Sequence, residues 1–287
     1  MERVPLAFCE SVIACFEKPS SIVQPLLSSA LWQTAIVREA ENRLHIDLNI
    51  GFNNGNWSAA FYKLLPHRQS RKLTFEDLQK LDRRNIRLYK LTVCKLSFTE
   101  QWSFEEILKI VTFTLPCVSM TVLSLSHIYT YPTNDLLQLL TLYRNSPIYS
   151  LYSWENIHQV DDFTTNLLRS NMLRSVGLHG ANVSDTFRAQ LEDFALYKPF
   201  QSIKLESKDF KFSQSFFENL FAKPLCGAFQ ECSFTSHFDF SLADLKDFRP
   251  ELQINGLTEK VQWKREDGVV VEAKMYCYGI IKLTFTR

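Results

Sequence analysis

A short phrase of alternating apolar and polar residues recurs along the chain. Its second apolar residue falls at positions 93, 125, 151, 178, 205 and 234, so the steps are 32, 26, 27, 27 and 29 residues. Such alternation is typical of a strand with one buried face. A near-constant step of this size predicts tandem α/β units stacked as a solenoid with a parallel sheet. The six copies are Leu91-Thr92-Val93, Leu123-Ser124-Leu125, Tyr149-Ser150-Leu151, Val176-Gly177-Leu178, Ile203-Lys204-Leu205 and Cys232-Ser233-Phe234.

Each phrase is followed by a polar residue that suits a helix N-cap and then by a run of helical apolar spacing. A cap side chain accepts a hydrogen bond from one of the unpaired N–H groups at a helix start, which is worth about 1 kcal/mol. The regular order of strand, cap and helix supports the repeat more than any single element does. The predicted caps are Ser103, Thr133, Asp161, Ser184, Ser213 and Ser241.

The two ends of the chain follow other patterns. Residues 5–43 have apolar spacings of three and four, which predicts helices, whereas residues 44–50 alternate as a strand. Asn54-Gly55 then predicts a hairpin, and Thr74 with Asp77 predicts a capping box. Near the other end, Asp267-Gly268 predicts a second hairpin that caps the array. We therefore expect a helical module at 1–43, an α/β array at 44–258 and a hairpin cap at 259–287.

Composition narrows the function classes. A net charge of +1 gives no polyelectrolyte signal, so we expect no nucleic-acid partner. The 7 cysteines are odd in number and scattered, as in reduced proteins of the cytoplasm or nucleus. Glu2 and Arg3 interrupt any signal peptide, and no run of 18 apolar residues occurs, so we expect no membrane partner.

Motifs for chemistry are missing. The chain has no Gly-x-Ser-x-Gly turn and no phosphate-binding loop, and it has only 8 glycines from which to build one. The nearest metal-like cluster is Cys226, Cys232 and His237, which lacks a fourth ligand. The expectation is a protein without a catalytic site, metal or cofactor.

Binding is better supported. In each predicted strand the residues between the buried positions point away from the core, onto what would be the concave face of a solenoid. Aromatic groups bury area at low entropic cost, so Tyr152 and His179 are the best anchors. The alternative is that all of these are ordinary solvated strand residues. The candidates are Ser124, Tyr152, His179, Lys204 and Glu206.

The repeat resembles the leucine-rich-repeat horseshoe in a degenerate form. Where the usual repeat has an Asn after the strand, this chain has Ile128, Trp154, Ala181 and Lys208. The N-terminus is similar to an F-box, which begins with a Pro, continues with apolar helical positions and reaches a Trp. The residues that match this layout are Pro5, Phe8, Val12, Phe16, Leu27 and Trp32.

The whole arrangement resembles the large nematode families of F-box and F-box-associated proteins. That resemblance implies a substrate receptor of a cullin-type ubiquitin ligase, with residues 5–32 on a Skp-family adaptor and the array on an unknown target protein. Two alternatives stay open. The protein could be a stand-alone binding or inhibitor scaffold whose N-terminal helices only cap the array. An enzyme would instead need a deep pocket with convergent titratable groups.

Overall fold

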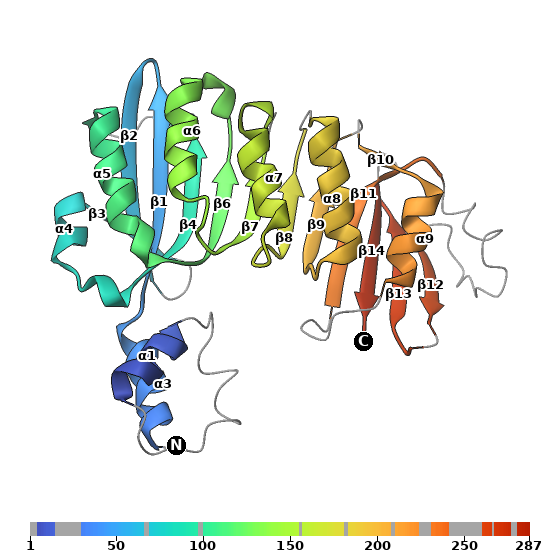
Figure 1. Ribbon diagram of the computed structural model, residues 1–287, viewed down its shortest axis with the longest axis horizontal. Helices are drawn as coiled ribbons and strands as arrows, with labels where there is room; N and C mark the ends of the chain where they lie inside the picture. Colours follow the sequence, from blue (N-terminus) through green and yellow to red (C-terminus); the bar gives the residue numbers. More distant parts are fainter. Residues whose placement is uncertain are drawn as a thin grey trace. The chain divides into compact units, whose positions relative to one another are not determined.

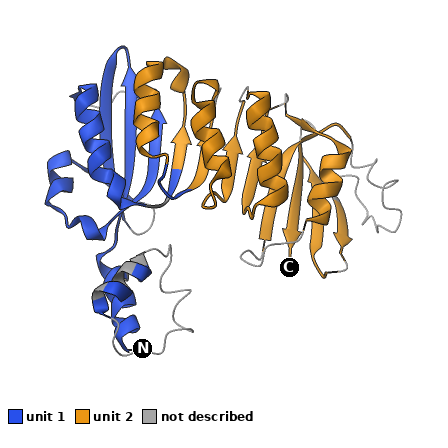
Figure 2. Ribbon diagram, in the orientation of Figure 1, with its two compact units in different colours: residues 1–122, 145–148 blue, residues 123–144, 149–287 orange. Residues whose placement is uncertain are grey.

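The structure is a computed structural model that describes residues 5–14, 30–65, 69–96, 100–154, 157–180, 183–207, 210–223, 231–240, 260–265, 267–276 and 280–287. The fold is α/β, with a largely parallel multi-stranded sheet that does not close into a barrel (Figure 1). The chain divides into two compact units (Figure 2). Unit 1 comprises Met1–Val122 and Asn145–Ile148, and unit 2 comprises Leu123–Arg144 and Tyr149–Arg287.

Unit 1 holds the predicted helices and the first hairpin. Its strands run in the order β4-β1-β2-β3, with β5 against β2. The Asn54-Gly55 turn is confirmed, because both residues have positive φ, at 50° and 84°. The elements are α1 (Leu6–Ala14), α3 (Ala30–Asn42), β1 (Leu44–Asn53), β2 (Asn56–Leu64), β3 (Ser70–Leu73), α4 (Phe75–Lys80), β4 (Ile86–Cys94), β5 (Gln101–Trp102) and α5 (Phe104–Thr114).

Strand β6 (Val118–Leu125) is divided between the units, and the part of the array that follows it belongs to unit 2, apart from Asn145–Ile148. Here β7, β8, β9 and β11 are parallel neighbours in chain order, so the predicted adjacency of Leu151, Leu178 and Leu205 is confirmed. The elements are α6 (Thr133–Leu142), β7 (Ile148–Ser153), α7 (Asp161–Arg169), β8 (Ser175–Leu178), α8 (Asp185–Tyr197), β9 (Ser202–Leu205), β10 (Lys211–Phe212), α9 (Gln214–Ala222) and β11 (Glu231–Phe238).

The C-terminal strands lengthen the sheet of unit 2. Strand β14 (Ile280–Thr286) pairs antiparallel with β11, β13 (Val270–Met275) pairs with β14, and β12 (Lys260–Lys264) pairs with β13. Gly268 has a φ of 83°, as the Asp-Gly turn requires. The predicted hairpin therefore forms, and it joins the sheet through a third strand that lies between it and β11.

The core of unit 2 lies between its strands and the helices α7, α8 and α9, which cover one face of the sheet (Figure 1). The registered row Leu151–Val176–Ile203–Phe234 is at most 1% exposed at every position. The six phrases are thus strands, but only some of them are aligned: Leu178 faces Leu205 as the repeat predicts, whereas Leu151 faces Val176 and Phe234 faces Ile203. A shift of two residues keeps the same face buried, so alternation alone cannot detect it.

Four of the predicted helix caps are confirmed. The side chains of Thr74, Ser103, Ser184 and Ser213 each accept a hydrogen bond from the backbone N–H three residues later, at 3.0 to 3.2 Å. Thr74 and Ser103 complete capping boxes with Asp77 and Glu106. Ser241 lies outside the described residues.

Two cap predictions are wrong. The N-caps of α6 and α7 are Pro132 and Val160, and neither makes a side-chain cap bond. Thr133 and Asp161 are instead the first helical residues. In both places a short 3-10 turn precedes the helix, at Ile128–Thr130 and His158–Val160. Neither Pro132 nor Val160 has a polar side chain that could accept from the free N–H groups, and Val160, with a ψ of 19°, also lacks the extended backbone of an N-cap.

Basic side chains donate hydrogen bonds to carbonyls at the C-terminal ends of three helices in unit 2. Lys198 Nζ donates to the Arg169 and Ser170 carbonyls behind α7. Lys223 Nζ donates to the Ala195 carbonyl of α8 at 2.6 Å. Arg265 Nη1 donates to the Phe221 carbonyl of α9 at 2.7 Å. Because helix C-termini leave carbonyls unpaired and carry partial negative charge, each cation stabilises the helix before it in the array.

Candidate functional site

Strand alternation in unit 2 places a set of polar and aromatic side chains on the face opposite α7–α9. Tyr152, Gly177 and Lys204 face one another across β7, β8 and β9. The hydrogen-bond ladder continues beyond these strands, because the His179 N–H donates to the Ser153 carbonyl at 2.8 Å and the Glu206 N–H donates to the Leu178 carbonyl at 2.9 Å. We call Tyr152, Trp154, Gly177, His179, Lys204 and Glu206 the Trp154 cluster.

The Trp154 indole stacks on the His179 imidazole. The ring centroids are 4.2 Å apart and the planes differ by 9°. The backbone N–H of Trp154 donates to the Leu125 carbonyl at 3.1 Å, which fixes the backbone from which the indole extends. Trp154 nevertheless stays 56% exposed. A large aromatic ring that is both fixed and exposed is the kind of side chain that dominates protein interfaces.

Glu206 contacts both the stacked His179 ring and the neighbouring Lys204. Its Oε2 lies 2.6 Å from His179 Nδ1, and its Oε1 lies 2.6 Å from Lys204 Nζ. A carboxylate accepts hydrogen bonds, so the His179 proton is on Nδ1. The Lys204 hydrogen bond, followed by that of His179, lowers the pKa of Glu206 below its ordinary value. Glu206 is therefore ionised near neutral pH, and its charge-assisted support of the stack is lost as the pH falls through its lowered pKa.

Gly177 is required by the close approach of Tyr152. A Cβ placed on Gly177 would lie 2.4 Å from Tyr152 Cδ1, far inside van der Waals contact. The missing side chain gives the Tyr152 ring its position over β8. Tyr152 of β7 and Trp154 directly after it thus present two aromatic rings, the first positioned by Gly177 of β8 and the second by His179 directly after β8.

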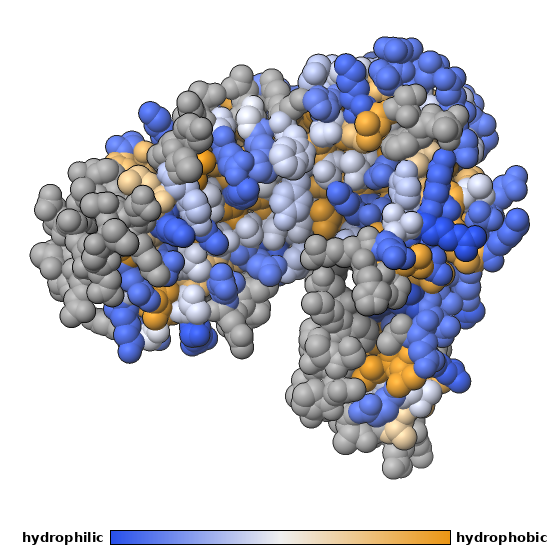
Figure 3. All heavy atoms as spheres, turned by 180° about the vertical axis from the view of Figure 1, so that it is seen from behind, coloured by the Kyte–Doolittle hydropathy of each residue, from blue (hydrophilic) through white to orange (hydrophobic). Residues whose placement is uncertain are grey.

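A row of serines lies beside the Trp154 cluster. Ser150, Ser175, Ser202 and Ser233 face one another in register across four strands. Ser150 and Ser175 are each 5% exposed, and the predicted contact residue Ser124 is 7% exposed. These short side chains offer little surface to a partner. Figure 3 shows the molecule from behind, the side away from the helices of Figure 1, and most of its coloured atoms are blue or pale.

The structure brings some of the predicted adaptor-binding residues together. Helices α1 and α3 share a small core of Cys9, Ile13, Ala35 and Ile36, each at most 3% exposed, and Trp32 packs against it. Phe8 is 54% exposed, and its ring lies edge-on to Trp32 with centroids 6.5 Å apart. Pro5 is exposed and Val12 half-buried. Phe16 and Leu27 lie outside the described residues.

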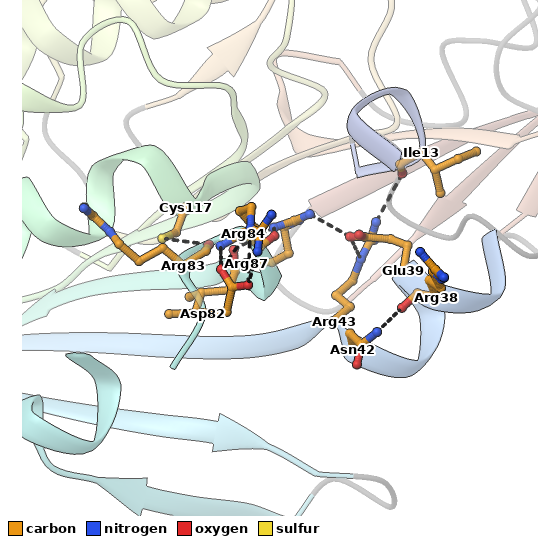
Figure 4. A network of polar contacts seen from close by, with 11 residues as sticks. Ile13, Arg38, Glu39, Asn42, Arg43, Asp82, Arg83, Arg84, Arg87 and Cys117 are labelled. Carbon is orange, nitrogen blue, oxygen red and sulfur yellow. Dashed lines mark hydrogen bonds and ion pairs between the residues drawn. The ribbon is translucent and has the colours of Figure 1, made fainter. Parts of the chain in front are cut away.

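A buried ion-pair network ties this helix pair to the sheet of unit 1 (Figure 4). Glu39 Oε1 accepts from Arg43 Nε at 2.9 Å and from Arg87 Nη2 of β4 at 2.7 Å. Arg43 Nη2 also donates to the Ile13 carbonyl near the end of α1, at 3.2 Å. The side chains of Glu39, Arg43 and Arg87 are at most 10% exposed. Sequence reasoning missed this network, since Glu39 and Arg87 lie far apart in the chain.

Metal ligation and thiol reactivity can be assessed for the described residues. No group of His, Cys, Asp and Glu among them could hold a metal ion, and Cys226 of the predicted metal-like cluster lies outside them. Burial raises the pKa of the Cys94 thiol to about 11 and also raises that of Cys117. Both thiols are therefore protonated and poor nucleophiles at neutral pH.

Comparison with known proteins gives no relative: no family model, no curated protein and no solved structure matches the chain. Among the described helices, none combines the length and the apolar character needed to cross a bilayer. The candidate site thus depends on geometry alone. Of the predicted contact residues, Tyr152, His179, Lys204 and Glu206 are gathered in one cluster. Trp154 was missed as a contact residue because its position was interpreted through the missing Asn of the repeat.

Proposed function

We propose that the protein is a non-enzymatic interaction adaptor of the F-box type, and that it acts in the cytoplasm or nucleus. In this proposal the array is a degenerate leucine-rich-repeat-like solenoid, and its helix-free face holds a target protein. The observation that carries the proposal is the Trp154 cluster, in which an exposed indole is fixed by a stack and an ion pair. Side chains that are ordered before binding lose less entropy on association.

The helix pair α1–α3 would dock on a Skp-family adaptor. In support of this, Phe8 is exposed and packs on the half-buried Trp32, beside a core in which four of the module's described residues are buried. One end of the protein would then bind the ligase and the other the target. Ubiquitin transfer would become effectively intramolecular, which raises its rate without any chemistry by the adaptor itself.

The second candidate is a stand-alone scaffold whose helices only cap the array. The buried contact of Glu39 with Arg87 favours it, because a cap must be fixed to the sheet that it covers. A fixed cap and a docking module are compatible, so this contact does not decide between them. Adaptor binding does.

The test is binding of the full-length protein to a purified Skp-family adaptor, measured by interferometry. We expect the wild type to bind and Phe8→Glu to weaken binding about tenfold, because the charge would have to be buried in an apolar interface. Val37→Glu is the matched control, since Val37 is 50% exposed on α3 and is not among the F-box-like residues. Failure of the wild type to bind, or equal effects of the two variants, would remove the F-box proposal and leave the scaffold.

A further inference from the structure

Lysines follow the Trp154 cluster along one row of the sheet of unit 2. Lys204 of β9 faces Thr235 of β11, which faces Lys282 of β14, which faces Lys274 of β13. The neighbours of these residues along each strand, such as Ile281, Leu283 and Ala273, are buried, so the row lies on the helix-free face. We call Lys204, Lys282 and Lys274 the lysine row.

The lysine row has an electrostatic cost inside the free protein. Like charges directly opposite each other on neighbouring strands are destabilising, and Lys274 faces Lys282 in this way. Glu206 neutralises Lys204. Among the described residues, no carboxylate forms an ion pair with Lys274 or Lys282. Folding alone gives no reason for this juxtaposition, whereas an anionic partner would.

Lys274 and Lys282 differ in exposure and in their neighbours. Lys274 is exposed and its Nζ lies 5.4 Å from the centre of the Tyr276 ring, a cation–π contact. Lys282 is half-buried. The nearest acidic residue on the same face of β13 is Glu272, which faces Thr284. On β13, Glu272 therefore offsets only part of the positive charge that Lys274 and Lys282 bring to this face.

The opposite end of the same row is aromatic. Tyr152 lies over Gly177, and Trp154 and His179 occupy the next row. From β7 to β13 there are five strand steps, or about 24 Å at the usual strand spacing, which an extended peptide crosses in about seven residues. One short segment can therefore contact the aromatic rings and both unpaired lysines.

We propose that the helix-free face of unit 2 binds an extended acidic segment of a partner protein, with an aromatic residue at one end and carboxylates about seven residues away. The aromatic residue packs on Tyr152 and Trp154, and the carboxylates pair with Lys282 and Lys274. This inference rests on the proposed target-holding function and names the chemistry of the target. It requires neither the Skp-family adaptor nor the N-terminal helices.

The experiment uses the full-length protein and a fluorescein-labelled peptide that carries a Trp at one end, a Gly-Ser spacer and a run of Glu at the other. We expect the double variant Lys274→Glu/Lys282→Glu to weaken peptide binding at least about tenfold. The control Lys80→Glu/Lys95→Glu makes the same change of net charge at exposed lysines of unit 1 and should leave binding within about twofold. Trp154→Ala should weaken binding to the Glu peptide and equally to its Gln counterpart.

Three results would overturn the inference. These are equal binding of the Glu peptide and the same peptide with Gln, equal effects of the two double variants, and stronger binding of a single-stranded oligonucleotide that displaces the peptide. Loss of adaptor binding in the interferometry experiment would not change any of these readouts. Failure of this inference and failure of the F-box proposal are therefore distinguishable.

Discussion

The helix pair α1–α3 and the strand array β7–β11 are each stabilised by different interactions. The array has continuous apolar rows, of which Leu151–Val176–Ile203–Phe234 is completely buried. Among the described residues, the helix pair has a small core of its own, and its polar link to the sheet is the buried network around Glu39. A repeated fold obtains its stability from burial between neighbours, whereas an added module needs its own attachment.

The helix pair and the array should unfold in different ways. Burial of many apolar side chains makes the array cooperative, so its strands should exchange amide hydrogens only on global unfolding. The described residues of the helix pair bury a smaller apolar core than the array does, and directional contacts of Glu39, Arg43 and Arg87 join the pair to the sheet. We expect it to open separately from the array, and each of the following experiments measures the two parts independently.

The largest effect should come from Glu39→Leu. The substitution leaves the guanidinium groups of Arg43 and Arg87 buried without their shared anion, and breaking a buried ion pair costs about 3–5 kcal/mol. Hydrogen exchange measured by mass spectrometry should show α1 and α3 losing protection while β8 and β9 keep theirs. Glu41→Leu, at an exposed position of the same helix, should change nothing. Equal loss of protection in the array would show that the helix pair is part of one cooperative core.

Ile203→Ala should have a somewhat smaller effect, confined to the array. Ile203 is 0% exposed and lies between Val176 and Phe234 in the buried row. Truncation of a buried Ile removes apolar contacts and leaves a cavity, at a cost of about 2–5 kcal/mol. The free energy of unfolding, measured with urea, should fall by that amount, with α3 as protected as before in native buffer.

The matched control for the array is Ser202→Ala, one residue earlier on the opposite face of β9. Ser202 is half-buried and its hydroxyl accepts from Ser233 Oγ at a long 3.4 Å, so we expect a change below about 0.5 kcal/mol. A large effect of the control would mean that the serine row, and not the apolar row, stabilises the array.

The same comparison explains how much the sequence could predict. Alternation identified all six strands because an apolar residue at every second position determines which face is buried. It could not give their register: Leu151 and Leu178 occupy equivalent positions of the repeat, yet Leu151 faces Val176. Local hydrogen bonds gave four caps correctly, and they failed where 3-10 turns precede α6 and α7.

Contacts between distant residues left no local signal. Glu39 and Arg87 are 48 positions apart, and neither stands in a motif. For the site, alternation correctly placed Tyr152, His179, Lys204 and Glu206 on one face. The exposure of Trp154 and the need for Gly177 depend on how the ends of neighbouring strands align, which only the three-dimensional structure provides.

The smallest predicted effect is a pH dependence of the helix pair that the core of the array does not share. His45 of β1 lies beside the Glu39 network, and its ring is edge-on to Tyr89 at 5.8 Å. Burial, followed by the charges of Arg43 and Arg87, lowers the pKa of His45 below its ordinary value of 6.5, and Glu39 opposes this only in part.

The sign follows from proton binding. Since the folded pKa of His45 is the lower one, the unfolded chain binds more protons between the two values, and stability decreases as the pH falls below 6.5. The loss stops once the pH is below the folded pKa as well.

Burial raises the pKa of the neighbouring Asp47, which has the opposite effect, so the prediction concerns the difference between wild type and His45→Gln. Exchange protection of α3 and β1 should fall on acidification from pH 7 to 5 in the wild type and less in His45→Gln, while β8 stays protected in both. If the two proteins lose protection in parallel, His45 is not the group responsible, and the attachment of the helix pair does not depend on its protonation.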